Sequence, residues 1–119
     1  MAALKVLVVE DEPLILMDLS DELSTRGFEV VEAANADVAL LLMQQHPDLT
    51  FLLTDIDMPG SMNGLGLAAA VHAERPLLHI LVASGKHRPA EEALPHGARF
   101  FPKPYRMNEI ALAMEEMAA

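Results

Sequence analysis

The residues that could do chemistry lie directly after the apolar runs of the sequence. Glu10 and Asp11 follow the first run, Asp55 the third, Ser84 the fourth and Lys103 the fifth. In a parallel sheet, functional groups gather at the carboxyl ends of the strands, so we expect these five side chains to meet at one edge. Three carboxylates in one place repel one another, and a hard divalent cation among them relieves that repulsion.

The residue types indicate which chemistry this edge could support. Carboxylate and carbonyl oxygens favour Mg²⁺, which keeps several waters and accepts phosphate oxygens as further ligands. Ser84 and Lys103 could donate hydrogen bonds to the other oxygens of a phosphoryl group. In-line attack by Asp55 on phosphorus needs positioning and neutralisation of charge from the protein. The residues therefore predict transfer of a phosphoryl group to a carboxylate.

The elements that must position this edge follow from alternating apolar runs and helical patterns. Continuous apolar runs predict strands that are buried on both faces, and the helical segments between them indicate a parallel sheet covered on both sides. The last strand is expected at the sheet edge, because Pro102 has no N–H for a ladder. The pattern predicts an α/β fold, a doubly wound five-stranded parallel sheet with five helices. The expected strands are Lys5–Val9, Phe28–Ala33, Phe51–Thr54, His79–Ala83 and Arg99–Pro102.

Capping residues and prolines predict four regular helices and one poor one. The poor helix lies between Pro89 and Gly97, where the ring of Pro95 would clash with the carbonyl four residues back, so no more than a turn or two is expected. Signals for the regular helices include Pro13 in a first turn and Asn35 as an amino-terminal cap. The regular helices are expected to begin near Pro13, Asn35, Gly64 and Met107.

The composition fits one soluble domain and argues against several classes of function. The chain has 119 residues, 52% of them hydrophobic and 22% charged, which predicts a single domain over residues 1–119. A formal net charge of −10 works against direct binding to nucleic acid or to a membrane surface. The absence of cysteine excludes disulfides and fits a cytoplasmic location. The stretch from Met1 to Val9 is expected to be neither a signal peptide nor a membrane span, because Glu10 follows at once.

The joint spacing of these motifs resembles the receiver domain of two-component response regulators, the CheY-like group. The resemblance rests on Val8–Pro13, Thr54–Gly60, Ala83–Gly85 and Lys103–Pro104, and it covers essentially the whole chain. It implies a flavodoxin-like, CheY-like sheet of order 2-1-3-4-5. It also implies that a histidine kinase or a histidine phosphotransfer protein phosphorylates Asp55. The protein would catalyse only its own phosphorylation and dephosphorylation, and would otherwise not be an enzyme.

The resemblance implies a role in metal binding for four residues. Asp11 would bind Mg²⁺ directly, and Glu10 would bind it directly or through water. Asp55, the phosphorylated residue, would be a further ligand, and the main-chain carbonyl of Asp57 would complete the protein ligands.

The resemblance also implies how the phosphoryl group is held and sensed. Ser84 would donate a hydrogen bond to it, and Lys103 would pair with it. Phe100 falls at the aromatic switch position of the family and would turn as the loop after the fourth strand moves inward. The surface made by the fourth helix, fifth strand and fifth helix would then signal to a downstream protein target or output domain. The Lys103–Pro104 peptide bond is usually cis in the family.

Three further hypotheses concern surface side chains. Leu14 and Met17 are candidate contacts for the helical kinase or phosphotransfer partner, with ordinary partial burial as the alternative. Leu112 is a candidate contact for a homodimer or a target, although surface variation explains it as well. An ion pair between Asp57 and Lys86 could partly cover the phosphorylated residue and set its lifetime.

Two other functions stay open. Asp55 and Asp57 also resemble the aspartate pair of haloacid-dehalogenase-type phosphatases, but the further metal-binding acids of that family follow its lysine, whereas here they precede Asp55. Steady turnover of a generic phosphomonoester would favour that enzyme. An interaction module that needs no phosphorylation would be indicated if small phosphodonors with Mg²⁺ left the protein unlabelled.

Gly64–Ala69 matches a dinucleotide fingerprint only in form, because no strand directly precedes it. The five histidines have no metal-binding spacing and are treated as structural or surface residues.

Overall fold

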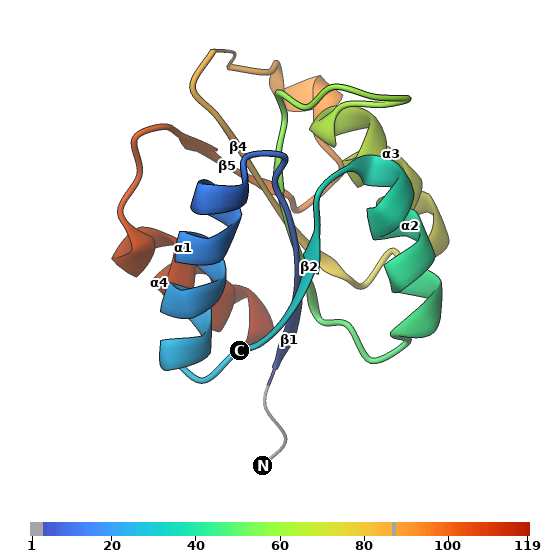
Figure 1. The fold of residues 1–119 in the computed structure, drawn as a ribbon. Coiled ribbons are helices and arrows are strands. Elements are labelled where there is room, and N and C mark those ends of the chain that lie inside the picture. Colours follow the sequence, from blue (N-terminus) through green and yellow to red (C-terminus); the bar gives the residue numbers. More distant parts are fainter. Residues whose placement is uncertain (1–3, 87) are drawn as a thin grey trace.

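The computed structural model describes residues 4–86 and 88–119, which fold into three layers with a parallel sheet in the middle (Figure 1). The order of the strands is β2-β1-β3-β4-β5, and all neighbours pair in parallel, so the predicted class and strand order are confirmed. His87 and residues 1–3, which include part of the amino-terminal stretch considered above, lie outside the described residues. The strands are β1 (Lys5–Val9), β2 (Glu29–Ala33), β3 (Phe51–Asp55), β4 (His79–Ser84) and β5 (Arg99–Pro102).

The prediction of five helices is wrong by one. The described residues contain four α-helices, and the segment between Pro89 and Gly97 forms only the 3-10 turn η1 (Glu91–Ala93). The physical reason is the one that made this helix poor in the sequence: Pro95 lies two residues after the end of this turn and cannot continue a helix. The label α4 therefore belongs to the predicted fifth helix. The α-helices are α1 (Pro13–Thr25), α2 (Ala36–Gln45), α3 (Gly64–Glu74) and α4 (Met107–Ala118).

Each face of the sheet carries its own hydrophobic cluster. In β1, alternate residues point to opposite faces, so Val6 and Val8 pack with α1 and α4 while Leu7 and Val9 pack with α2 and α3. Figure 1 shows these two pairs of helices on opposite faces of the sheet. A fully buried Leu or Val side chain stabilises the fold by about 1.5–3 kcal/mol relative to an exposed one. The sheet between the two clusters is therefore a rigid platform for the loops at its carboxyl end.

The register of the strands fixes which residues meet at that end. Asp55 is the last residue of β3 and pairs with Ala83, and Ser84 is the last residue of β4 and pairs with Pro102. Both strands are one residue longer than predicted. The ladder continues past them, because the Ile56 N–H donates to the Ala83 carbonyl (2.9 Å). Asp55 and Ser84 are thus held by main-chain hydrogen bonds on the sheet itself.

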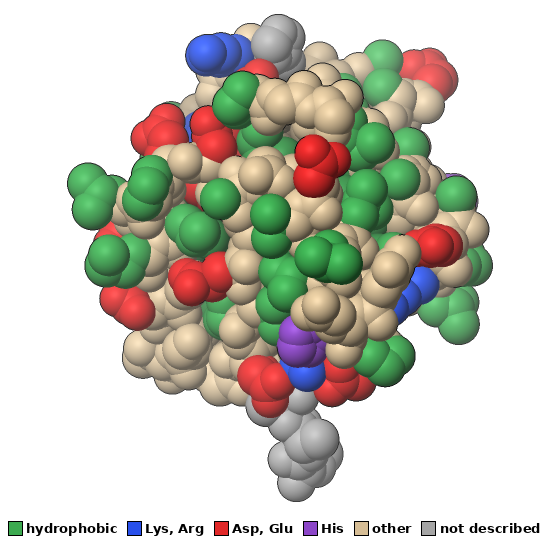
Figure 2. Space-filling model, turned by 45° about the vertical axis from the view of Figure 1, so that its right-hand side comes forward, with side chains coloured by type: hydrophobic (Ala, Val, Ile, Leu, Met, Phe, Trp, Pro, Cys, Tyr) green, Lys and Arg blue, Asp and Glu red, His purple; other side chains and the backbone are tan. Residues whose placement is uncertain are grey.

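The surface reflects the acidic composition. On the face shown in Figure 2, Asp and Glu side chains are scattered among hydrophobic ones, and Lys and Arg side chains are few. Within residues 4–86 and 88–119, no helix is both long and apolar enough to cross a membrane.

Candidate metal centre

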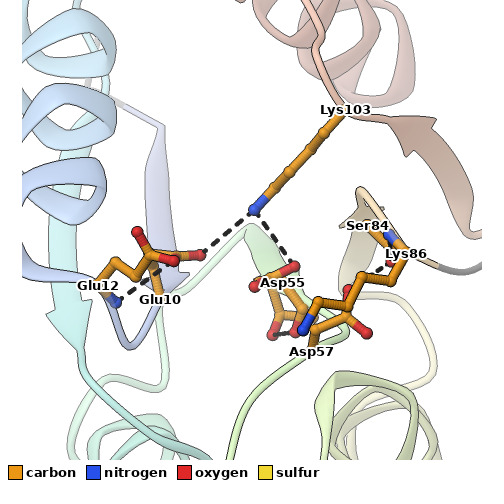
Figure 3. A network of polar contacts seen from close by, with 8 residues as sticks. Glu10, Glu12, Asp55, Asp57, Ser84, Lys86 and Lys103 are labelled. Carbon is orange, nitrogen blue, oxygen red and sulfur yellow. Dashed lines mark hydrogen bonds and ion pairs between the residues drawn. The ribbon is translucent and has the colours of Figure 1, made fainter.

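Three carboxylates converge at the carboxyl end of the sheet, as the sequence predicts. Oxygens of Glu10, Asp11 and Asp55 all lie within 4.8 Å of one another. Glu10 and Asp55 are buried, with 2% and 8% of their surface exposed, and Asp11 is partly exposed. They come from two different strand ends, since Glu10 and Asp11 follow β1 and Asp55 ends β3. Figure 3 shows Glu10 and Asp55 on these two segments.

Lys103 supplies one positive charge to this cluster. Its Nζ lies 3.4 Å from Asp55 Oδ1 and 3.9 Å from Glu10 Oε2, and Figure 3 shows the side chain reaching down between the two acids. The Lys103 N–H donates to the Ser84 carbonyl (3.0 Å), which anchors the start of this loop to β4. The Lys103–Pro104 bond is cis, as the resemblance implied. One ammonium group faces three carboxylates, so the cluster keeps an excess of negative charge.

Glu10 and Asp55 in this cluster have raised pKa values, so their charged forms are disfavoured. Burial raises the pKa of Glu10 to about 7, although Lys103 opposes the shift, and the charge of Asp55 adds to it. Burial also raises the pKa of Asp55, again against the effect of Lys103. Burial and the charges of Glu10 and Asp55 raise the pKa of the nearby Tyr105 to about 12. Burial, together with the neighbouring negative charges, therefore disfavours further negative charge here.

The donor set fits a divalent cation. Asp55 Oδ1 is buried and has no hydrogen-bond partner among the described residues, although the Lys103 ammonium lies near it. A buried acceptor without a hydrogen bond is rare in native proteins, and a bound cation would satisfy this one. Three clustered carboxylates are hard oxygen ligands of the kind that Mg²⁺ and Ca²⁺ take. The cluster is therefore compatible with metal binding.

Asp57 lies next to the cluster, at a tight turn. The Met58 N–H donates to the Ile56 carbonyl (3.1 Å), so the chain reverses around Asp57 directly after β3. Asp57 and Asp11 line the same groove of about 700 Å³, which opens beside the acids. Metal binding by the Asp57 carbonyl stays a prediction.

The hydroxyl of Ser84 is engaged by Asp57. Ser84 Oγ donates to Asp57 Oδ2 (2.5 Å) and accepts from the Lys86 N–H (3.1 Å), as Figure 3 shows. The ion pair expected between Asp57 and Lys86 stays a prediction. The strand ends place Ser84 and Asp57 side by side, and sequence reasoning missed that their side chains would bond.

Gly64 is a residue of the site whose importance sequence reasoning missed. A Cβ at this position would lie 2.0 Å from the Asp55 carbonyl oxygen and 2.8 Å from Ile56 Cα. The Gly64 N–H donates to the Ile56 carbonyl (3.0 Å), and Asn63 caps the helix by accepting from the Gly66 N–H (3.0 Å). Helix α3 thus begins in direct contact with the backbone of the candidate phosphoacceptor, and only glycine leaves room for it. The available signal was a glycine at the first helical position, close behind the Asp55 loop.

Phe100 lies half-buried on β5. It packs against the hydrophobic cluster on the α2 and α3 side of the sheet, and the guanidinium carbon of Arg88 lies 5.7 Å from the centre of its ring. Arg88 belongs to the same connection that begins at Ser84, so the loop after β4 contacts both the site and the aromatic residue. The switching role of Phe100 stays a prediction.

Comparison with known proteins decides the family. The sequence model of the response regulator receiver domain matches residues 6–115, which is most of the chain. The chain belongs to this family. It is a receiver domain of two-component systems, so the resemblance stated from the motifs is confirmed.

Curated relatives support the assignment over nearly the whole receiver domain. The glycerol metabolism activator of Pseudomonas putida is 33% identical over 119 residues, covering 95% of this chain and 53% of the relative. The transcriptional regulatory protein PdtaR of Mycobacterium tuberculosis is 34% identical over 116 residues, covering 93% of this chain and 55% of the relative. The receiver domain thus spans about half the length of these curated relatives.

Solved structures support the fold. A response regulator receiver domain protein from Clostridium thermocellum superposes with a TM-score of 0.89 at 23% identity, covering 96% of this chain and 93% of that chain. The three-layer architecture is therefore the fold of known receiver domains.

Proposed function

We propose that this receiver domain accepts a phosphoryl group on Asp55 from a histidine kinase or a histidine phosphotransfer protein, in a reaction that requires Mg²⁺. Receiver domains pair with histidine kinases. The observation that carries the proposal is the buried Asp55 Oδ1, which accepts no hydrogen bond within the described chain and lies 3.4 Å from the Lys103 ammonium. Its lone pairs are not occupied by a hydrogen bond from the described residues, and a positive charge lies beside it.

The residues of the chain account for the transfer step. Asp55 Oδ1 attacks phosphorus in line, the new P–O bond forms, and the bond to the imidazole nitrogen of the donor breaks. The β3 ladder and the start of α3 at Gly64 hold the attacking carboxylate in place, which removes much of the entropic cost of the step. Lys103 stabilises the negative charge on the equatorial oxygens.

A bound Mg²⁺ would supply further positive charge to the phosphoryl oxygens. The side chains of Glu10, Asp11 and Asp55 and the carbonyl of Asp57 would hold it. Its charge would favour the ionised forms of Glu10 and Asp55, whose pKa values are raised mainly by burial.

We infer that the domain catalyses only its own phosphorylation and dephosphorylation. A phosphatase of the haloacid-dehalogenase type would need acids that follow its lysine. In the described residues, the one group of acids placed for a metal is formed by Glu10, Asp11 and Asp55, and it precedes Lys103 in the chain. No steady turnover of a generic phosphomonoester is therefore expected.

The exposed apolar residues of α1 suggest where the phosphodonor docks. Leu14 and Met17 are 75% and 54% exposed beside the acidic site. A hollow of about 400 Å³, lined in part by Ile15, Pro104 and Tyr105, continues this surface. A helical kinase or phosphotransfer partner could bury these side chains while its phosphohistidine reaches Asp55.

The output surface would consist of η1, β5 and α4. Phe100 and its contact with Arg88 join this surface to the Ser84 end of β4. A downstream protein target or an output domain would read the change, and Leu112, which is 57% exposed on α4, is available for such a contact or for a homodimer. Such signalling fits a cytoplasmic location.

Intact-mass spectrometry after incubation with acetyl phosphate and Mg²⁺ tests the proposal. The wild type should gain one phosphoryl group, and both Asp55→Asn and a sample without Mg²⁺ should gain none. Glu12→Gln is the matched control, because it neutralises an exposed acid on the rim of the same groove. Labelling that persists in Asp55→Asn would contradict the assignment. An unlabelled wild type would favour an interaction module that needs no phosphorylation.

A further inference from the structure

The single hydroxyl proton of Ser84 is committed in this structure. A serine hydroxyl has one O–H donor, and here that donor bonds to Asp57 Oδ2 at 2.5 Å. This distance is typical of a hydrogen bond from a hydroxyl to an ionised carboxylate, which is about twice as strong as a neutral one. Ser84 is 2% exposed, so water competes poorly for the bond. While it persists, Ser84 has no proton to donate to a phosphoryl group.

The backbone of Ser84 is fixed, so only its side chain can change partners. Ser84 pairs with Pro102 in the β4–β5 register, and its carbonyl accepts from the Lys103 N–H at 3.0 Å. The strand end therefore stays with the sheet. Rotation about χ1, between staggered wells, is what remains to carry the hydroxyl from one acceptor to another.

We infer that the Asp57 side chain is a latch that competes with the phosphoryl group of Asp55 for the Ser84 hydroxyl. The inference rests on the proposed function and adds a positioning residue to it. In the unphosphorylated domain the latch is closed, and a phosphoryl group gains its hydrogen bond from Ser84 only by displacing the Asp57 carboxylate. The latch thus disfavours the phosphorylated arrangement and the movement of the loop that follows Ser84.

The latch should multiply the affinity for a phosphoryl mimic by the fraction of time in which the Ser84 hydroxyl is not bonded to Asp57. A hydrogen bond to a charged group typically corresponds to a factor of roughly 10–150 in an equilibrium constant. Asp57→Ala should raise the affinity for beryllofluoride with Mg²⁺ by about that factor. Asp57→Asn removes the charge but keeps an oxygen acceptor, so its affinity should lie between those of the wild type and Asp57→Ala.

A double-mutant cycle separates the latch from a general effect of charge. In a Ser84→Ala background, Asp57→Ala and Asp57→Asn should bind beryllofluoride equally, within about twofold. If the difference between Asp57→Ala and Asp57→Asn persists without the Ser84 hydroxyl, or is absent with it, the latch is refuted. Denaturation curves of each variant verify that it is folded. A wild type that neither binds beryllofluoride nor is labelled by acetyl phosphate refutes the proposed function itself, which is a different outcome.

Amide hydrogen exchange provides a readout that needs neither metal nor phosphate. The Lys86 N–H donates to Ser84 Oγ in the closed latch. In the metal-free domain, Asp57→Ala removes the carboxylate that accepts from the Ser84 hydroxyl and holds its rotamer, so exchange at Lys86 should become faster than in the wild type. Glu12→Ala, which removes another acid of the same groove, should leave it unchanged. Equal exchange at Lys86 in the wild type and Asp57→Ala would overturn the latch.

Discussion

The two ends of the sheet each carry a lysine surrounded by acids, yet their electrostatics are opposite. At the amino end, Lys5 Nζ lies 2.9 Å from Asp48 and 3.1 Å from Glu29, and these acids are mostly exposed. Their mutual hydrogen bond raises the pKa of Lys5 and lowers that of Asp48. At the carboxyl end, Lys103 lies 3.4 Å from Asp55, and burial still raises the pKa of that carboxyl group.

Burial decides the difference between the two ends. A carboxylate that keeps its hydration gains from a nearby ammonium, so its charged form is favoured. A buried carboxylate loses hydration that a single shared ammonium does not replace. The amino end is therefore a completed ion-pair cluster, whereas the carboxyl end lacks positive charge that a divalent cation could provide.

The largest expected effect is a loss of stability when Gly64, which contacts the backbone of Asp55 at the carboxyl end of the sheet, is replaced by alanine. Gly64→Ala places a Cβ 2.0 Å from the Asp55 carbonyl oxygen, so β3 or α3 must shift. Urea denaturation should show a loss of at least ~2–3 kcal/mol, and labelling of Asp55 should fall with it. Gly66→Ala is the matched control, because its Cβ would meet only side-chain atoms, at 3.2 Å or more, and should change stability by less than about 1 kcal/mol. Equal losses in both variants would show that the contact at Gly64 does not matter.

The second effect is a gain in the free energy of unfolding when the charge of the buried Glu10 is removed. The pKa of Glu10 is about 7 in the folded state against 4.5 ordinarily, so the folded protein binds more protons between these values and loses stability as the pH rises through them. In the metal-free protein at pH 8, Glu10→Gln should therefore raise the free energy of unfolding by up to about 3 kcal/mol. The gain should disappear near pH 4. If Glu10→Gln were less stable than the wild type at pH 8, the carboxyl end would not differ from the amino end in the way described.

The smallest effect concerns an acid at the amino end of the sheet, where removing the charge should lower stability instead of raising it. Asp48→Asn removes an exposed partner of Lys5, so stability should fall slightly, and added salt should shrink the difference. Because the pKa of Asp48 is lowered, its contribution should be present at neutral pH and disappear as the pH falls below its ordinary value of 3.8. Denaturation midpoints at pH 7 and pH 3 measure this, and a stabilising Asp48→Asn would contradict the completed ion-pair cluster.

Much of the fold follows from the sequence, because local signals determine it. The apolar run Val6–Val9 is typical of a strand buried on both faces, and Pro95 prevents a full helix before β5. The site acids are predictable for a related reason, since parallel strands bring their carboxyl ends together. The order of the strands came from the resemblance to the receiver family.

Contacts between side chains of separate loops were not predictable in the same way. The Ser84–Asp57 hydrogen bond depends on two rotamers that no local pattern specifies. The position of Arg88 above Phe100 depends on the path of an irregular connection. The close approach of Gly64 to Asp55 depends on the angle at which α3 packs, which the tertiary structure sets.

The central claim is that the carboxylates of Glu10, Asp11 and Asp55 lack positive charge that a cation would provide. Its most direct test is the free energy of unfolding of the wild type between pH 5 and pH 8, with and without Mg²⁺. Without Mg²⁺, Glu10 and Asp55 should make stability fall as the pH rises. Saturating Mg²⁺ should restore it at pH 8, by about 2.7 kcal/mol at 100 times the dissociation constant, and Asp11→Asn should lose most of this gain. The same curve with and without Mg²⁺ would contradict the account.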